Sequence, residues 1–516
     1  MADGVGIDLG TTHCCVYVQR PNRVAQLVKN KEGDNTTPSW VRYEENGITV
    51  VGKSAKKQSP KKANSTIRNA KRLIGRGYSD PAVQSEIQRM PFKIFEDSGV
   101  PVIQAKGLSA EGNSEWKKNI RPEEVSATLL SSLREGARQF LGTPVSKAVI
   151  TVPANFKEHQ KSATVKAATL AGFSDVNLLH EPTAAAIAYG EMLNEQCTVM
   201  VFDFGGGTLD ITIMEVIARK KYKVLTTDGD MYLGGEDFDN EIVKYFLSDI
   251  KAKHNRDFSK DSKILATLKL VAEEAKIALS VPNAQIYRDS IDALESVLGR
   301  EYEAVLTKTS FDSMFGSLLE NIIKPVKRAL ESIDYSPADI SKVIMVGGSS
   351  KLPAVRHHLG RFFGRDDIVC ADVNPDEMIA RGAAMQSYLL NNNLSITVQE
   401  TTPFYYGLKQ YDGSISVLIP IRTEYPCSFT KVFVTAKDDQ TGVSFKIFQS
   451  KCGFALDKYQ IGRFDISNLP ARKKGECKFD VTFEINANNL LHVTAQGKGT
   501  IAHCKDKIVI DVKPTY

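Results

Sequence analysis

One short pattern occurs twice in this sequence, and the repetition constrains the fold more than any other feature. Residues 7–12 (IDLGTT) and 202–208 (FDFGGGT) both read as an apolar strand with an aspartate near its end, followed by a glycine turn and a threonine. Two such units predict two similar halves that face each other. The alternative is chance, since a strand that ends in an aspartate and a glycine turn is common on its own.

The predicted pattern of secondary structure changes near residue 400. Up to about residue 390, β-branched runs such as residues 147–153 (KAVITVP) alternate with helical stretches, which predicts an α/β architecture. One helix is expected from Pro122, which suits a first turn, to Gly142, which stops it. From about residue 401, short strands with inside/outside alternation predict an all-β domain.

Polar segments mark the expected boundaries. Residues 391–403 (NNNLSITVQETTP) are polar first and then partly apolar, which indicates a linker between two domains. Residues 486–489 (NANN) indicate a hairpin turn, because asparagine tolerates a positive φ.

Composition excludes several classes of protein. The chain has 66 basic and 61 acidic residues, and the net charge of +5 is too small for this length to argue for nucleic acid. There is no run of 18 apolar residues and no secretory signal pattern at the start, so a membrane span and secretion are not expected. The eight cysteines form no CxxC pair, and reduced thiols in the cytosol or nucleus are expected.

Two glycine turns have the chemistry of a phosphate site. Backbone amides hold phosphate oxygens, and glycine lets the backbone approach them closely. The turns Gly10-Thr11-Thr12-His13 and Gly205-Gly206-Gly207-Thr208 fit that need. Each follows an aspartate, Asp8 or Asp203, that can face the water shell of Mg²⁺. One such turn alone would more often be only a tight turn, whereas the matched pair favours phosphate binding.

A third glycine segment matches a phosphate-loop pattern by chance. Residues 47–54 (GITVVGKS) fit GxxxxGK[ST], but their middle is Ile-Thr-Val-Val, the most strand-like stretch of its neighbourhood. A true phosphate loop leaves its middle free to curl around phosphate, so Lys53 is not expected to bind nucleotide.

Seven segments together carry a family resemblance. In chain order they are GIDLGTT (6–12), AKRLIGR (70–76), ITVPANF (150–156), HEPTAAAIAYG (180–190), VFDFGGGTLD (201–210), LGGEDFD (233–239) and VGGSSKLP (346–353). In these segments, their order and their spacing, the chain resembles the seventy-kilodalton heat-shock proteins, a chaperone family. The resemblance implies an actin-like, ribonuclease H-like duplicated α/β ATPase domain followed by an all-β peptide-binding sandwich.

The resemblance also implies catalytic roles. Asp8 and Asp203 would hold hydrated magnesium, and Lys71 would contact the γ-phosphate or the attacking water. Glu181 and Asp210 would orient that water. Without the resemblance, Lys71 would be interpreted as a solvated helix lysine and Glu181 as an acid that favours a helix N-terminus.

The implied ligand is ATP or ADP with Mg²⁺, and K⁺ is an optional second cation. Thr208 would touch the γ-phosphate. The adenosine contacts would come from one helix face and from later loops: Glu273, Lys276, Ser280, Gly347, Gly348, Ser349, Lys351 and Asp376. Lys351 stands where the family usually stacks an arginine on adenine, and Ile277 replaces another arginine of many members, so looser adenine binding is expected.

In the β-rich part, the resemblance implies a cleft for an extended apolar peptide. The matching positions are Leu408, Tyr411, Phe433, Ala436, Val443 and Phe445. The same alternation fits an ordinary sandwich core equally well. Phe445 replaces a smaller aliphatic residue, which predicts a shallower or altered pocket.

Other positions concern the coupling between the two parts. Pro153 and Lys161 match the family's interdomain relay, whereas residues 395–400 (SITVQE) replace its leucine-rich linker. Asn177 replaces an arginine that helps dock J-domain co-chaperones, so that docking is expected to be weaker. The sequence ends at Tyr516, after the last expected strand, without a helical lid.

The predicted organisation is a nucleotide-binding domain over residues 1–390, with lobes of about 1–193 and 194–390. A linker (391–400) and a lidless substrate-binding β-sandwich (401–516) follow. The predicted function is an ATP-hydrolysing chaperone that acts on unfolded or nascent polypeptides with J-domain co-chaperones and nucleotide exchange factors. The alternatives are a weakly hydrolysing scaffold, in contact with nucleic acid only through ribosomes, and a small-molecule kinase, which would need no β-domain.

Overall fold

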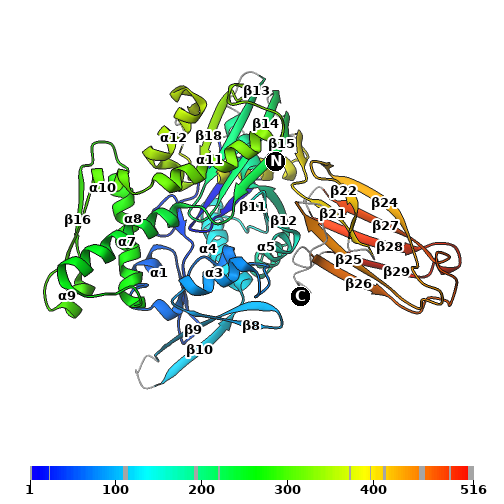
Figure 1. Cartoon of the computed structure of the whole chain (residues 1–516), viewed down its shortest axis with the longest axis horizontal. Helices are drawn as coiled ribbons and strands as arrows, with labels where there is room; N and C mark the ends of the chain where they lie inside the picture. The colour runs from blue at the N-terminus through cyan, green and yellow to red at the C-terminus, as the bar shows by residue number, and fades with distance from the viewer. Residues whose placement is uncertain are drawn as a thin grey trace.

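The computed structural model shows an α/β part and, beside it, a β-rich part formed by the C-terminal quarter of the chain (Figure 1). Among the residues described, no helix has the length and apolar character to cross a membrane. The described residues are 3–21, 24–108, 114–190, 196–218, 221–370, 374–394, 397–410, 414–451, 460–486 and 490–509.

The first half of the α/β part is built on one sheet in the order β12-β11-β1-β2-β3, with β4 beside β2. The strands β1, β11 and β12 are parallel, and β2 runs antiparallel to β1. The bounds are β1 (Gly4–Leu9), β2 (His13–Gln19), β3 (Gln26–Leu27), β4 (Thr37–Pro38), β11 (Lys147–Val152) and β12 (Asp175–His180).

The second half repeats this design in the order β19-β18-β13-β14-β15. Here β13, β18 and β19 are parallel, and β14 is antiparallel to both β13 and β15. The bounds are β13 (Cys197–Phe204), β14 (Leu209–Ala218), β15 (Lys221–Asp230), β18 (Lys342–Val346) and β19 (Val369–Cys370). The internal repeat predicted from the two glycine turns is therefore confirmed at the level of strand order and direction.

Two helices lie between the halves, α6 (Glu181–Gly190) and α13 (Met378–Asn391), and they pack against each other. Helix α13 also packs on β1, β2 and β11, whereas α6 packs on β13, β14 and β18. A Cβ added to Gly6 would lie 2.0 Å from the backbone nitrogen of Ala384 in α13. A Cβ added to Gly382 would lie 1.8 Å from the carbonyl oxygen of Ala184 in α6. The backbones touch here, so glycine is required.

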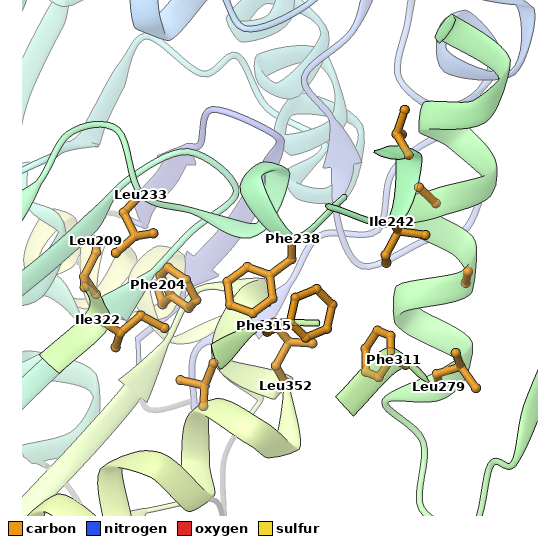
Figure 2. Close-up of a cluster of buried hydrophobic side chains, with 14 of the residues drawn as sticks. Phe204, Leu209, Leu233, Phe238, Ile242, Leu279, Phe311, Phe315, Ile322 and Leu352 are labelled. Atoms are coloured by element: carbon orange, nitrogen blue, oxygen red, sulfur yellow. The ribbon is translucent and has the colours of Figure 1, made fainter. Parts of the chain in front are cut away.

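A large apolar core supports the second half (Figure 2). Phe204 at the end of β13 and Leu209 at the start of β14 are both fully buried in it. Phe204 contacts Phe238 edge-on at 6.0 Å between ring centroids, and Phe238 lies 4.7 Å from Phe315. The glycine turn at residues 205–208 is therefore anchored at both ends by rigid packing.

The remaining helices cover the sheets or extend the two halves. The predicted helix is present as α4 (Pro122–Leu141), and Gly142 caps it in the left-handed conformation at φ 74°. The other helices are α1 (Lys53–Gln58), α2 (Ala70–Leu73), α3 (Pro81–Arg89), α5 (Glu158–Leu170), α7 (Gly235–His254), α8 (Ser262–Leu279), α9 (Asp292–Leu298), α10 (Lys308–Ser313), α11 (Gly316–Glu331) and α12 (Pro353–Phe363).

Three small sheets complete the α/β part. One of them contains β6 (Thr49–Val51), the middle of the GITVVGKS segment, which is paired with β5 as a strand. The bounds are β5 (Val41–Tyr43), β7 (Thr66–Ile67), β8 (Lys93–Asp97), β9 (Val100–Leu108), β10 (Glu115–Ile120), β16 (Ile286–Ser290) and β17 (Glu303–Thr307).

The β-rich part has two antiparallel sheets, in the orders β22-β21-β25-β26 and β24-β27-β28-β29, that share one apolar core. The predicted strands are thus present; residues 487–489 of the predicted hairpin lie outside the described residues. The bounds are β21 (Tyr405–Lys409), β22 (Ile415–Ile419), β24 (Cys427–Val434), β25 (Val443–Ser450), β26 (Gln460–Ile466), β27 (Lys478–Ile485), β28 (Leu491–Gly497) and β29 (Lys505–Val509).

A strand from the expected linker joins the two parts. β20 (Thr397–Thr401) adds to the second sheet parallel to β15, and β23 (Glu424–Tyr425) pairs with β20 in turn. Glu400 is buried there and accepts hydrogen bonds from Thr183 and Tyr425, with His180 Nδ1 at 3.3 Å. The predicted linker residues 395 and 396 lie outside the described residues.

A second buried polar contact joins α5 to the β-rich part. The Lys161 ammonium lies 3.1 Å from the Glu158 carboxylate, and both side chains are almost fully buried. Glu158 accepts hydrogen bonds from the Tyr406 hydroxyl at 3.3 Å and from the Leu491 backbone at 3.0 Å. Lys161, predicted to act in an interdomain relay, therefore reaches the β-rich part through Glu158.

The helix contact gives a direct stability test. Gly382→Ala forces the α6 and α13 backbones apart, so we expect the free energy of unfolding to fall by about 1–3 kcal/mol. The matched control is Gly136→Ala inside α4, where a Cβ would meet only Val28 at 3.8 Å. It should gain about 0.5–1 kcal/mol from helix propensity. Urea unfolding measures both, and a neutral Gly382→Ala would contradict the close contact.

Glu400 predicts sensitivity to acid. Burial tends to raise its pKa, but His180, Thr183 and Tyr425 outweigh burial and lower the pKa from 4.5 to about 2. Because the folded pKa is the lower one, this stabilisation is present above pH 4.5 and is lost as the pH falls toward 2. Between pH 6 and pH 3.5 the wild type should lose about 1 kcal/mol more than Glu400→Gln, measured by urea unfolding. Equal losses would contradict the prediction, and Glu274→Gln at an exposed site on α8 serves as control.

Candidate nucleotide site

A cleft of about 1230 Å³ lies between the two halves. Most residues predicted to contact nucleotide line it: Asp8, Gly10, Thr11, Thr12, His13, Lys71, Glu181, Asp203, Gly205, Gly206, Thr208, Glu273, Lys276, Ser280, Gly347, Gly348, Ser349, Lys351 and Asp376. Gly207 and Asp210 are not among the lining residues and lie just behind the surface of the cleft.

The two glycine turns meet across this cleft. A Cβ added to Gly206 would lie 2.1 Å from the Thr12 methyl group, although the two residues belong to different halves. Behind them, a Cβ on Gly234 would lie 2.4 Å from the Gly207 backbone nitrogen. No side chain larger than hydrogen fits at these positions, so the turns present backbone to the cleft, as a phosphate site requires.

Buried carboxylates are concentrated at the floor of the cleft. Burial raises the pKa of Asp8 to about 7, and the neighbouring Glu181 adds to the effect. Burial likewise raises the pKa of Asp203 well above its ordinary value, with further contributions from Glu181, Asp210 and Asp8. Asp8 and Asp203 occupy corresponding positions near the ends of β1 and β13. The repeat thus directs two like charges into one buried space.

Lys71 and Glu181 form a close ion pair at this floor. The Lys71 Nζ lies 2.5 Å from Glu181 Oε1, and both side chains are more than nine-tenths buried. Burial tends to lower the pKa of Lys71, but Glu181 and Asp8 outweigh burial and raise it. Lys71 therefore remains a fixed positive charge among carboxylates, which is the arrangement that stabilises a transferring phosphoryl group.

Asp210 lies beside Asp203 and is not among the residues that line the cleft. It faces Asp203 across β13 and β14, and its Oδ1 accepts a hydrogen bond of 3.0 Å from Asn155 Nδ2. Burial raises its pKa to about 6, against the opposing effect of the Asn155 hydrogen bond. Asp210 thus adds a buried carboxylate beside Asp203, whose pKa it helps to raise.

The chemistry of this floor fits a hydrated magnesium ion. Burial, together with neighbouring carboxylates, raises the pKa values of Asp8 and Asp203, and a divalent cation would stabilise both groups in their ionised form. Among the described residues no three ligand side chains are placed to hold a metal directly. Magnesium retains several waters and takes few protein carboxylates, so two aspartates that touch its water shell suffice.

The expected adenosine side of the cleft is held together by ion pairs. Lys276 Nζ lies 2.7 Å from Asp239 and donates to the Gly235 carbonyl at 3.0 Å. Glu273 pairs with Lys56 of the first half at 2.7 Å. The Lys351 ammonium contacts Asp376, and this pairing occupies the residue that replaces the expected arginine.

Sequence reasoning missed a buried network that bridges the halves. The Glu236 carboxylate of α7 accepts from Asn69 Nδ2 at 2.9 Å, and Arg68, Arg72 and Lys269 lie within 4 Å of it. Burial tends to raise the pKa of Glu236, but Lys269, Arg68 and Arg72 lower it to about 2. Arg72 and Glu236 lie in two of the segments that carry the family resemblance, 70–76 and 233–239, but no sequence pattern indicates that they contact each other.

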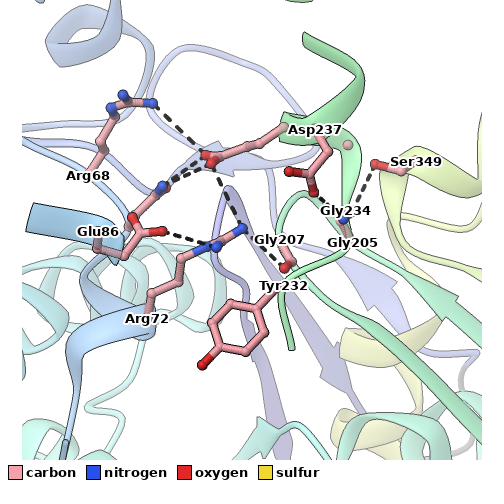
Figure 3. Close-up of polar contacts among 12 residues, drawn as sticks. Arg68, Arg72, Glu86, Gly205, Gly207, Tyr232, Gly234, Asp237 and Ser349 are labelled. Atoms are coloured by element: carbon pink, nitrogen blue, oxygen red, sulfur yellow. Dashed lines mark hydrogen bonds and ion pairs between the residues drawn. The ribbon is translucent and has the colours of Figure 1, made fainter. Parts of the chain in front are cut away.

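Arg72 is the centre of this network (Figure 3). Its Nη1 donates to Glu86 Oε1 at 3.0 Å, and its Nη2 donates to the Gly207 carbonyl at 3.1 Å. A residue of the first half therefore holds the glycine turn of the second half from behind.

The residues predicted for a peptide cleft divide into two groups. Leu408 and Phe445 are buried in the shared core, where Phe445 stacks on Phe464 at 5.1 Å and meets Phe479 edge-on at 5.7 Å. Phe433 and Val443 pack partly against that core, and Ala436 is exposed. Tyr411 lies outside the described residues. For Leu408 and Phe445 the core alternative fits the packing better than an open pocket.

Two sheets of the same design share a single cleft, and each contributes a glycine turn and a carboxylate to it. These features are typical of the class of two-lobed α/β nucleotide-binding proteins. A comparison with family models narrows this class, because the model described as Hsp70 protein matches residues 4–514. The chain belongs to the Hsp70 family, and the resemblance seen in the sequence is confirmed. Members of this family are ATP-dependent chaperones that bind ATP or ADP with Mg²⁺, unfolded polypeptides and co-chaperones.

A binding test can compare a lysine that lines the cleft with a lysine that lies outside it. Lys53 pairs with Asp34 at 3.0 Å and is not among the lining residues, so Lys53→Ala should change ATP affinity by less than about twofold. Lys276 lines the cleft, and Lys276→Ala should weaken affinity at least about fivefold, equivalent to one hydrogen bond. Isothermal titration with ATP measures both. A large loss in Lys53→Ala would restore the phosphate-loop interpretation of residues 47–54.

Proposed function

We propose that this chain is an ATP-driven chaperone with an actin-like nucleotide-binding domain over about residues 1–390 and a β-sandwich over about 401–516. One observation carries the proposal: Asp8 and Asp203 leave equivalent strands of two like halves and line one cleft beside the Lys71–Glu181 pair. A sugar kinase of similar design would have no use for the β-rich part. A cytosolic or nuclear address remains part of the proposal.

The chain's own groups suit hydrolysis of a phosphoanhydride. Water attacks the γ-phosphorus of ATP, the bond to the β-γ bridging oxygen breaks, and ADP and inorganic phosphate leave with one proton released near neutral pH. Lys71 neutralises charge on the transferred group, and Thr11 and Thr208 offer hydroxyl donors from the two turns. Glu181 and Asp210 are the groups we assign to orient the attacking water, because Glu181 lines the cleft beside Lys71 and Asp210 lies next to Asp203.

A second candidate function, a scaffold with little peptide turnover, is favoured by one observation. Phe445, Phe464 and Phe479 pack together between the two sheets where the family resemblance would place a peptide pocket. Titration of a labelled apolar peptide distinguishes the candidates, because the chaperone binds the peptide and responds to ATP, whereas the scaffold does neither.

Single-turnover hydrolysis tests the ATPase. Wild type should cleave bound ATP slowly, and Lys71→Ala should reduce the rate at least about 100-fold, because the fixed positive charge at the phosphoryl group is lost. Acid quench and separation of ADP measure the cleavage. Lys53→Ala is the matched control, since it removes a paired surface lysine outside the cleft and should cleave at the wild-type rate. Absence of cleavage in the wild type would refute the ATPase.

A further inference from the structure

A second, small cavity lies directly behind the inner end of the nucleotide cleft. Thr11, Lys71 and Thr208 line both spaces, so these three residues form the wall between them. Elsewhere the small cavity is lined by Arg72, Arg76, Glu86 and the exposed Tyr232, among others. Its volume of about 20 Å³ is enough for a water molecule and too small for a phosphate ion.

Two arginines of this cavity are buried with donors left over. Arg72 donates through Nη1 and Nη2 to Glu86 and Gly207, and Arg76 Nη1 donates to Asp80 at 2.8 Å. The Nε of Arg72 and the Nε of Arg76 are both buried without a hydrogen-bond partner among the described residues, and so is the acceptor Oε2 of Glu86. Both side chains are only 8% exposed. An unpaired buried donor is destabilising, so the pair is suited to an anion or to water.

The outer wall of the cavity is partly in contact with solvent. Tyr232 follows β15 in a turn, is 48% exposed, and holds that turn through its backbone nitrogen, which donates to Asp230 at 2.8 Å. Figure 3 shows its ring beside Arg72, at the side away from the Gly234 loop. Because about half of the Tyr232 residue surface is already in solvent, turning the side chain outward would expose little additional apolar area.

We propose that this cavity is a site and an outlet for inorganic phosphate. Phosphate released at Thr11, Lys71 and Thr208 passes to Arg72 and Arg76 and leaves past Tyr232 while ADP still occupies the cleft. The proposal rests on the ATPase proposed above for its phosphate. A dianion is attracted by the arginine pair through charge-assisted hydrogen bonds, and the cavity must widen before the ion can pass.

The geometry gives a reason for such an outlet. The phosphate product forms at the inner end of the cleft, and the bound ADP then lies between it and the open side. Phosphate must either wait for ADP or leave through the opposite wall. That wall contains three polar side chains and, behind them, two arginines with spare donors.

The kinetic test follows three events in one turnover of the full chain. Acid quench reports bond cleavage, a fluorescent phosphate-binding protein reports free phosphate, and a fluorescent ADP derivative reports ADP departure. In the wild type we expect phosphate to appear after cleavage and before ADP leaves. Tyr232→Ala should shorten the delay at least about threefold and Tyr232→Trp should lengthen it, with cleavage unchanged within about twofold. Tyr232→Phe keeps the ring and is the matched control.

Two results of that test would overturn the outlet. One is phosphate that departs only together with ADP in every variant. The other is a delay that does not respond to the size of the side chain at position 232, including the absence of any delay.

The equilibrium test does not depend on turnover. Inorganic phosphate is titrated into the ADP-loaded chain and followed by phosphorus NMR, and Arg76→Met should weaken its affinity about tenfold, since one charge-assisted hydrogen bond is lost. Arg76→Lys retains the charge and guards against misfolding through loss of the Asp80 contact. It should weaken affinity less. Equal affinities in wild type and Arg76→Met, or no binding in the wild type, would overturn the phosphate site. If the wild type cleaves no ATP, the ATPase fails while this titration still decides the site.

Discussion

The two halves share a cleft only because two helices pass between them with almost no side chain in the way. Gly6 allows α13 to lie against the first sheet, and Gly382 allows α13 to lie against α6. Each helix follows the last strand of one half, and each packs on the sheet of the other half. This close contact sets the distance between the sheets, and therefore the distance between the glycine turns that extend from them.

Electrostatics in the cleft follows from that spacing. Once the strands fix Asp8 and Asp203 in a common buried space, their charges must be met by other groups, and Lys71 meets only part of them. Glu236 shows the opposite balance, since one carboxylate holds three basic side chains and stays ionised. The floor of the cleft is thus short of positive charge, whereas the charge of the Glu236 carboxylate is compensated by its basic neighbours. A charged ligand with its cation is therefore best accommodated at the floor.

The sequence predicts the features that are local in the chain and misses those that arise from contact between distant segments. Short sequence patterns predict the two glycine turns, the helix that begins at Pro122 and the strands of the β-rich part. Most predicted nucleotide contacts line one cleft, because the family segments mark them. The Asn69–Glu236 hydrogen bond joins residues 167 positions apart and leaves no pattern in the letters. Phe445 illustrates another limit, since alternation does not tell a core side chain from one that lines a groove.

Strand β20 does more than connect the two parts. In its absence the first residues of β15 would be the edge of a large sheet, with backbone N–H and C=O groups open to any extended chain nearby. Strand β20 therefore protects the edge of β15, and β23 pairs with the outer side of β20 in turn. Any movement that draws the β-rich part and β20 away would leave the edge of β15 unpaired and able to pair with another strand. A second extended chain would then find an unpaired strand edge at the place that β20 leaves.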